Sequence, residues 1–293
     1  MSETVRPDGA RIHYEVHGEG FPVLLLAPGG VSGRSASWGD DLYDPVGELS
    51  RHFKVIAVDQ RHTGRSSAPA APFSYEESAA DHLAVLDEVG AARAHVVAAE
   101  FGCAQAWRLA RTAPDRVCSV VAQEPAGRDT TNTLGDFFTP FDEAMRLPRA
   151  AGLDDPETEG LGAVFEAAAT NGVFAANPQA GPFAQRLHDD AQFRADVLAL
   201  RREKYITLLV RFRDALLPEG HRLFSVPDEW ITECAAPLLV LPGRAPCQPE
   251  GVARWIAERA PSATLLDAGF DEPARRAQTV TSIVEFLLKN TPS

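Results

Sequence analysis

Glu100 lies between a predicted strand and a predicted helix. A carboxylate at such a turn can take part in catalysis. Residues 95–99, HVVAA, form a short apolar run that is typical of a buried strand. Helical apolar spacing begins directly after Gly102 and includes Ala104 and Trp107. A carboxylate held in a tight strand-to-helix turn faces a helix N-terminus, where it can act as a general acid, a general base or a nucleophile.

A second carboxylate, Glu124, ends the next apolar run, residues 117–123. Because the carboxyl ends of adjacent parallel strands converge on one crevice, we expect Glu124 to lie near Glu100. Two carboxylates in one apolar pocket tend to separate in pKa, which gives one acid and one base. The sequence therefore predicts a general acid/base pair. The alternative for Glu124 is a loop residue at the start of the segment that follows.

The elements that must position these carboxylates alternate between strands and helices. Ser74 and Glu77 form a capping-box pattern, which predicts a helix start, and Gly90 predicts its end. Further strands are predicted at residues 11–17, 22–27, 54–59, 237–242 and 263–267, and helices at 250–259 and 277–288. This order predicts an α/β protein with a mostly parallel central sheet flanked by helices.

The alternation is interrupted between residues 127 and 235. Buried strand patterns are absent there, and helical spacing takes over, with apolar side chains on one face at Tyr205, Leu208, Leu209, Phe212 and Leu216. We therefore expect a core made of residues 1–126 and 236–293, with an inserted helical cap at residues 127–235.

Three segments resemble α/β-hydrolases in order and spacing. They are APGG at residues 27–30, VDQRHTGRSS at residues 58–67 and A-x-E-x-G at residues 98–102. The last is similar to the nucleophile elbow G-x-S-x-G, with Glu100 in place of the serine. In the second segment, His62 stands where the family usually has glycine. The chain is identified on these motifs as a divergent member of the superfamily, and the resemblance implies the α/β-hydrolase fold with a helical cap.

The resemblance also implies which residues surround Glu100. It places oxyanion-hole donors at the backbone amides of Gly30 and Phe101, while Gly29 provides the loop conformation. Arg34 and Trp38 are expected to line an apolar substrate cavity. For other polar residues near these motifs we expect structural roles: Asp59 and His62 in loop structure, and Cys103 and Cys247 as small buried side chains.

Two departures from the family pattern decide the chemistry. The loop at residues 243–248, where the family places the triad acid, has no carboxylate before Glu250. Phe270 occupies the histidine position after the last strand, and no histidine follows His221. Acyl transfer by a serine triad requires that imidazole, so the triad is degenerate.

Three functions stay open from the sequence. The first is a non-triad enzyme that isomerises, eliminates or cyclises a small apolar molecule by acid/base chemistry at Glu100 and Glu124. The second is an ester, lactone or epoxide hydrolase with Glu100 as nucleophile, assisted by a cap histidine, His188 or His221. The third is a ligand-binding protein without catalysis.

Composition limits the partners of this chain of 293 residues. Its net charge of −13 argues against binding to nucleic acid or to an anionic membrane surface. Its four scattered cysteines and polar first residues predict reduced thiols and a cytoplasmic protein. No phosphate-binding glycine motif or metal-ligand spacing is visible, so we expect no cofactor and no metal. The oligomeric state stays open, a homodimer included.

Overall fold

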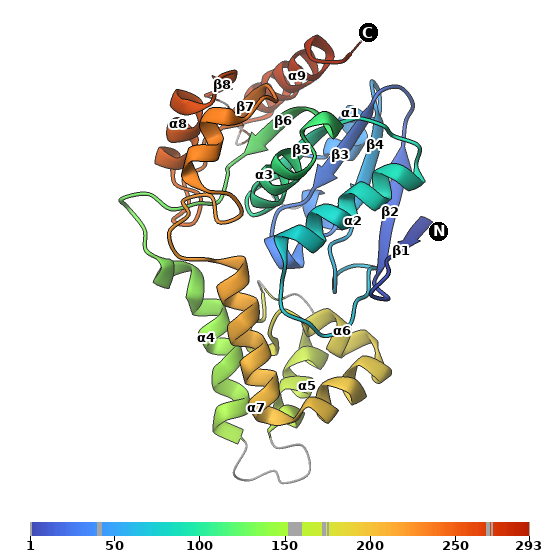
Figure 1. The fold of residues 1–293 in the computed structure, drawn as a ribbon, viewed down its shortest axis with the longest axis vertical. Helices are drawn as coiled ribbons and strands as arrows, with labels where there is room; N and C mark the ends of the chain where they lie inside the picture. The colour runs from blue at the N-terminus through green and yellow to red at the C-terminus, as the bar shows by residue number, and fades with distance from the viewer. Residues whose placement is uncertain are drawn as a thin grey trace.

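The computed structural model describes residues 2–39, 43–151, 160–171, 174, 176–267, 270 and 272–292. Its centre is an eight-stranded sheet with the strand order β1-β2-β4-β3-β5-β6-β7-β8 (Figure 1). The strands are β1 (Ser2–Val5), β2 (Arg11–His17), β3 (Pro22–Leu26), β4 (Lys54–Val58), β5 (Ala94–Ala99), β6 (Val117–Gln123), β7 (Leu238–Leu241) and β8 (Ala263–Leu265).

The sheet is parallel from β4 to β8 and antiparallel at one edge. The strands β1 and β2 pair antiparallel with each other, and β2 pairs antiparallel with β4. The parallel register aligns Ala98 with Leu26 of β3 and with Ala122 of β6, so the carboxyl ends of these three strands lie together. This edge is where an open parallel sheet presents its functional crevice.

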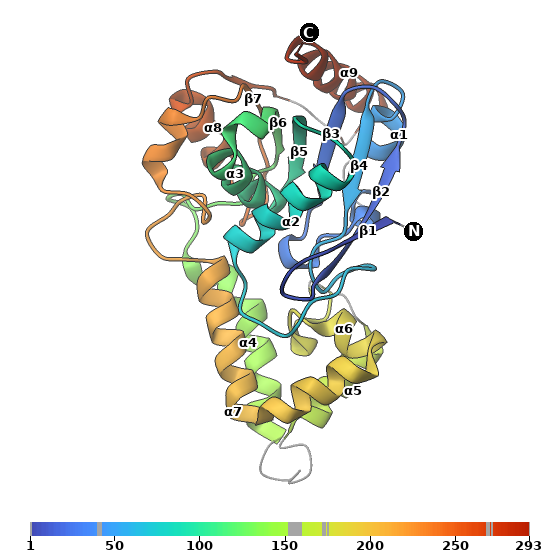
Figure 2. The same cartoon turned by 45° about the vertical axis from the view of Figure 1, so that its right-hand side comes forward.

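Side chains alternate between the two faces of the sheet and form two separate cores. On β3, for example, Leu24 belongs to one core and Leu25 to the other. The helices α2 (Tyr75–Glu88), α3 (Gly102–Thr112) and α8 (Glu250–Arg259) cover the first face. The helices α1 (Pro45–Leu49) and α9 (Pro273–Lys289) cover the second. Figure 2 shows these layers from a second direction.

A helical segment connects β6 to β7 and lies beyond one end of the sheet (Figures 1 and 2). It contains α4 (Leu134–Ala151), α5 (Leu161–Thr170), α6 (Ala184–Asp189) and α7 (Ala191–Leu216), with the short 3-10 helices η4 (Pro178–Ala180) and η5 (Asp228–Glu233). The helix α7 changes direction at Arg201, where φ is 66°. The five apolar residues predicted for one face of this segment are all buried in α7.

Local signals place most elements correctly. The predicted strand at residues 11–17 is β2, and Ser74 is the N-cap of α2, since the Glu77 amide donates to Ser74 Oγ at 3.1 Å. The edge strand β1 was not expected from the sequence. The mostly parallel sheet flanked by helices agrees with the predicted α/β-hydrolase fold. None of the helices in the described part of the chain is long and apolar enough to cross a membrane.

Candidate active site

Glu100 lies in a strained turn between β5 and α3. Its φ angle is 49°, in the left-handed region that side-chain-bearing residues rarely adopt. Its backbone is fixed on both sides, because its N–H donates to Gln123 O at 2.9 Å and its carbonyl accepts from the Cys103 and Ala126 amides at 3.1 Å. Such strain persists only where the surroundings enforce it, and it concentrates at functional sites. The turn therefore has the geometry expected of an elbow.

The close approach of two elements explains why glycine follows the turn at position 102. A Cβ atom on Gly102 would overlap the carbonyl oxygen of Leu26 and would lie 2.8 Å from that of Ala27. The start of α3 thus lies directly against the end of β3. This contact fixes the position of Glu100 relative to the end of β3.

The carboxylate of Glu100 reaches the loop after β3. Its Oε2 accepts a hydrogen bond from the Gly29 amide at 3.2 Å, and the residue is half-buried. Gly29 has a φ of 87°, a conformation that favours glycine. The bond from Gly29 adds a contact that the sequence did not predict, and the roles of the Gly30 and Phe101 amides as oxyanion-hole donors stay a prediction. The contact ties the loop after β3 to the carboxylate at the turn after β5.

Glu124 repeats the same backbone geometry on the neighbouring strand. Its φ is 48°, and its amide donates to Leu241 O at the end of β7 at 2.8 Å. A Cβ atom on Gly243 would lie 3.0 Å from the Cβ of Glu124, so the glycine leaves room for this side chain. Two glutamates in left-handed conformation thus follow two adjacent parallel strands.

One buried thiol lies within electrostatic reach of both carboxylates. Burial raises the pKa of the Cys103 thiol well above its usual range, and the charges of Glu100 and Glu124 raise it further. Cys247, on the loop after β7, is affected similarly: burial raises its pKa first, followed by the charges of Asp136 and Glu100. Both thiols are therefore held neutral, and neither is poised as a nucleophile.

Three phenylalanine rings cover the elbow from the side of the helical segment. Phe101 stacks on Phe224 with ring centroids 6.0 Å apart and contacts Phe137 edge-on at the same distance. Phe137 and Phe224 are themselves 5.0 Å apart. Phe101 belongs to the elbow, Phe137 to α4 and Phe224 to the chain after α7. The helical segment therefore packs apolar rings next to the residue that follows Glu100.

The two remaining triad positions have structural roles. Phe270 is buried in the core of the second sheet face and stacks on Tyr43, with centroids 5.4 Å apart and ring planes 4° apart. Glu250 forms an ion pair with Arg254 on the surface of α8. Gly269 and Asp271, the neighbours of Phe270, lie outside the described residues.

The two histidines considered as assistants to Glu100 have other neighbours. His188 is about half exposed on α6 and contacts Asp189 at 2.6 Å. His221 lines a pocket on the outside of the core together with Arg108 and Pro227.

Of the two residues expected to line the substrate cavity, one requires a correction. Trp38 is 2% exposed and belongs to the core of the second sheet face, because its short 3-10 helix η2 (Ser35–Gly39) turns the indole inward. Arg34 lies between the core and the helical segment, in a small pocket that it shares with His62 and Gln185.

The position of His62 next to cavities is not predicted from the sequence. It was assigned to loop structure, but it lines both cavities between the core and the helical segment, and its φ is 67°. Its ring contacts Phe183 edge-on at 4.9 Å. The available signal was that His62 stands where the family usually has glycine. Glycine is usual at that position because the backbone there is left-handed.

Metal-binding side chains do not gather in this region. In the ranges that the structure describes, no group of three or more His, Cys, Asp or Glu residues is placed to hold a metal ion.

Comparisons with known proteins agree with the fold. A family model described as alpha/beta hydrolase fold matches residues 22–160. A candidate carbamate hydrolase, RutD, from Azorhizobium caulinodans is 37% identical over 111 residues, which cover 38% of this chain and 40% of that protein. Rhodomycin D methylesterase DauP from Streptomyces sp. strain C5 is 34% identical over 139 residues, 46% of this chain and 44% of that protein. The matched part of the chain thus spans less than half the length of either relative.

Similarity to solved structures extends over nearly the whole chain. The meta-cleavage product hydrolase CumD from Pseudomonas fluorescens IP01 superimposes with a TM-score of 0.62, covering 99% of this chain and 98% of that chain. The identity is 18%, so this similarity is one of fold.

Proposed function

Since the chain belongs to the α/β-hydrolase fold superfamily, we propose that it is an enzyme that uses Glu100 and Glu124 as a general acid/base pair. Its substrate is a small, largely apolar molecule bound between the core and the helical segment, which acts as a cap at residues 127–235. The reaction is an isomerisation, an elimination or a cyclisation.

The observation that carries this proposal is the shared position of the two glutamates. Each is the first residue after one of two adjacent parallel strands, each has a φ near 50°, and both charges act on the Cys103 sulfur. The proposed mechanism needs one of the two carboxyl groups protonated and the other ionised, as two carboxylates that share an apolar site tend to be.

An isomerisation requires no proton donor or acceptor from the protein other than these two carboxyl groups. The ionised carboxylate removes a proton from a substrate carbon, and the electron pair shifts along the substrate. The protonated carboxylic acid then donates its proton to the atom at the other end. The two glutamates finish with their protonation states exchanged, and the product has the composition of the substrate.

The contact between Gly29 and Glu100 supports the carboxylate at the elbow, because the Gly29 amide donates to Glu100 Oε2. The apolar packing of Phe270 further argues against an imidazole base from the usual loop.

The second candidate is hydrolysis with Glu100 as the nucleophile, which the similarity to hydrolases favours, since one relative is a methylesterase. A Glu100 oxygen would attack the electrophilic carbon, the bond to the leaving oxygen would break, and that oxygen would take a proton from water. The hydroxide that remains would then cleave the covalent intermediate and release Glu100 as a carboxylate. This pathway predicts a mass increase on Glu100 after rapid quenching.

We propose the cellular location and the partners of this protein from its composition. With a net charge of −13, we propose a cytoplasmic protein whose partner is a small molecule rather than nucleic acid or a membrane surface.

The test compares wild type with Glu100→Gln and Glu124→Gln against esters, thioesters, lactones, epoxides and isomerisable enones, with products identified by mass spectrometry. Glu48→Gln serves as a control, because Glu48 pairs with Arg51 on the surface. Loss of turnover in both site variants supports the acid/base pair. Loss in Glu100→Gln alone, with a covalent adduct on wild-type Glu100, supports the nucleophile. Unchanged turnover in both variants would overturn both candidates.

A further inference from the structure

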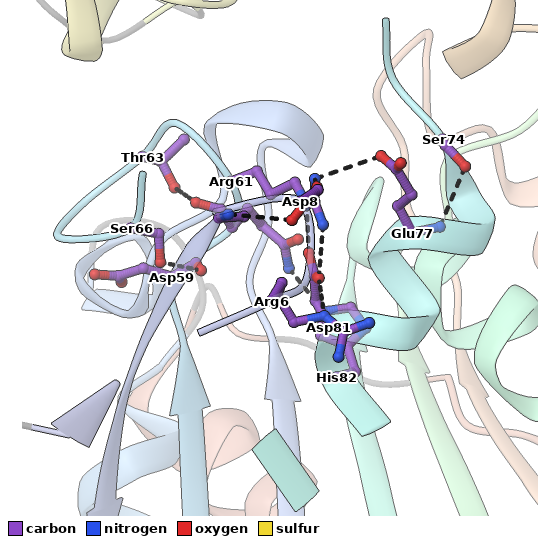
Figure 3. A network of polar contacts seen from close by, with 12 residues as sticks. Arg6, Asp8, Asp59, Arg61, Thr63, Ser66, Ser74, Glu77, Asp81 and His82 are labelled. Carbon is purple, nitrogen blue, oxygen red and sulfur yellow. Dashed lines mark hydrogen bonds and ion pairs between the residues drawn. The ribbon is translucent and has the colours of Figure 1, made fainter. Parts of the chain in front are cut away.

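A cavity separate from the two glutamates opens between the core and α7. It is enclosed by the loop after β4, the first turns of α2, the middle of α3 and Phe212 of α7. Its lining includes His62, Ser78 and Gln105, and it includes neither Glu100 nor Glu124. Figure 3 shows a polar network that includes four of its lining residues, Arg61, Ser74, Glu77 and Asp81.

Three buried polar atoms on the lining residues lack a hydrogen-bond partner in the described part of the chain. They are His62 Nδ1, Ser78 Oγ and Gln105 Oε1. The three residues are only 6%, 5% and 2% exposed, respectively. Buried polar groups are nearly always hydrogen-bonded, so three such atoms around one cavity point to a polar guest.

The charged residues at the mouth are already paired with one another (Figure 3). Arg61 forms a two-point contact with Asp81, at 2.6 and 2.9 Å, and also binds Asp8 at 2.5 Å and Glu77 at 3.4 Å. Arg6 binds Asp81 at 3.1 Å. A charged guest would enter next to ions that are already compensated, and it would lose its hydration without gaining a free counterion.

The histidines of this region add no charge. Burial lowers the pKa of His62 to about 3, helped by the nearby cations Arg61 and Arg186. Burial likewise lowers the pKa of His82, which contacts Gln60 at 3.3 Å, to about 4. Both rings are neutral at pH 7, so the hydrogen-bonding wall is uncharged.

Apart from the three residues with buried polar atoms, the paired charges of Arg61, Glu77 and Asp81 and the polar Gln60 and Ser74, the other lining residues are apolar, and the space is small. Phe73, Phe212 and Val31 face the cavity, and the centre of a water-sized sphere can move through about 30 Å³ of it. That is room for roughly two or three water-sized groups. A guest of this size has a short apolar body and one or two polar atoms.

We propose that this cavity is a binding site for a small neutral molecule with a hydrogen-bonding oxygen on a short apolar body, such as an alcohol or a ketone. The oxygen of the guest accepts from the Ser78 hydroxyl, and the O–H of an alcohol can also donate to Gln105 Oε1 or His62 Nδ1, while the carbon chain contacts Phe73 and Phe212. This site is independent of the acid/base function proposed for Glu100.

The experiment is a titration of the full chain followed by backbone amide NMR. Three probes share a three-carbon chain and differ in charge: propan-1-ol, propylammonium and propionate. Propan-1-ol is expected to shift the amides of residues 60–62, 73–78 and 105 saturably, and the two ions are expected to bind at least ten-fold more weakly. Ser78→Ala and Gln105→Met are each expected to raise the Kd of propan-1-ol about five-fold, since each removes one hydrogen bond.

Two control variants show whether binding depends on this cavity. Ser225→Ala also removes a buried hydroxyl that has no partner in the described part of the chain, but Ser225 does not line this cavity, so the Kd is expected to stay the same. Glu100→Gln is also expected to leave the Kd unchanged, which distinguishes this proposal from the acid/base function. Melting temperatures of Ser78→Ala and Gln105→Met establish that both variants are folded. Absence of saturable shifts, equal binding of the ions, or an equal effect of Ser225→Ala would overturn the proposal.

Discussion

The amide of Gly29 donates a hydrogen bond to Oε2 of Glu100 at 3.2 Å, which links the loop after β3 to the turn after β5. In a family whose elbow usually carries a serine, this contact makes the loop after β3 a support for a carboxylate at the elbow. The stability and the chemistry of the site are therefore coupled through one bond.

This coupling predicts an order of stability among substitutions at Glu100. Glu100→Gln keeps an oxygen that can accept from Gly29, whereas Glu100→Ala leaves a half-buried amide without that partner. We expect the alanine variant to be less stable than the glutamine variant by about 1 kcal/mol, measured by urea denaturation. Turnover is expected to be lost in both. Equal stability of the two variants would show that the Gly29 contact contributes nothing.

The close contact at Gly102 predicts a large effect from one methyl group. Gly102→Ala places Cβ against Leu26 O, a backbone atom that cannot move alone, so we expect a loss of about 3 kcal/mol in the free energy of unfolding. Gly135→Ala is the matched control, since its Cβ would meet only Thr133 Oγ1 at 3.4 Å in α4. That variant is expected to be neutral or slightly stabilising. Equal melting temperatures for the two would contradict the contact.

The packing of Phe270 predicts a strong dependence of stability on its ring. Phe270→Ala removes a side chain that is 7% exposed and stacked on Tyr43, so we expect a loss of about 3–5 kcal/mol. Phe138→Ala is the control, because this ring is only partly buried beneath the Arg213 guanidinium. A similar loss for both variants, measured in guanidinium chloride, would mean that Phe270 is not a core residue.

The buried histidines predict a pH dependence of stability. The folded-state pKa of His82 is lowered to about 4 from an ordinary value of 6.5, so the unfolded chain binds more protons between these values. Stability is therefore complete above pH 6.5 and falls as the pH decreases toward 4, by about 1.4 kcal/mol per pH unit for each such histidine.

Substituting this histidine tests the assignment. His82→Gln is expected to flatten the dependence of the free energy of unfolding on pH between 6.5 and 4, measured by urea titrations at several pH values. His188→Gln is the control, because the His188 ring is about half exposed. An unchanged slope in His82→Gln would exclude His82 as a source of the acid sensitivity.

The sequence by itself determined the elements and the type of turn at Glu100. The strands β2 and β6, the helix start at Ser74 and the elbow at Glu100 depend on local spacing, because side-chain period and capping act over a few residues. The absence of a histidine after His221 was also visible directly. These features require no knowledge of how the chain folds back on itself.

Only the tertiary structure decided which side chains meet. It turned Trp38 into the core, placed Phe270 on Tyr43, and brought the Gly29 amide to Glu100. It also gathered polar atoms of His62 and Ser78, from separate elements, around one cavity. Such contacts join residues that are far apart in the chain, and they depend on strand order and on packing between layers. Local periodicity contains no information about either.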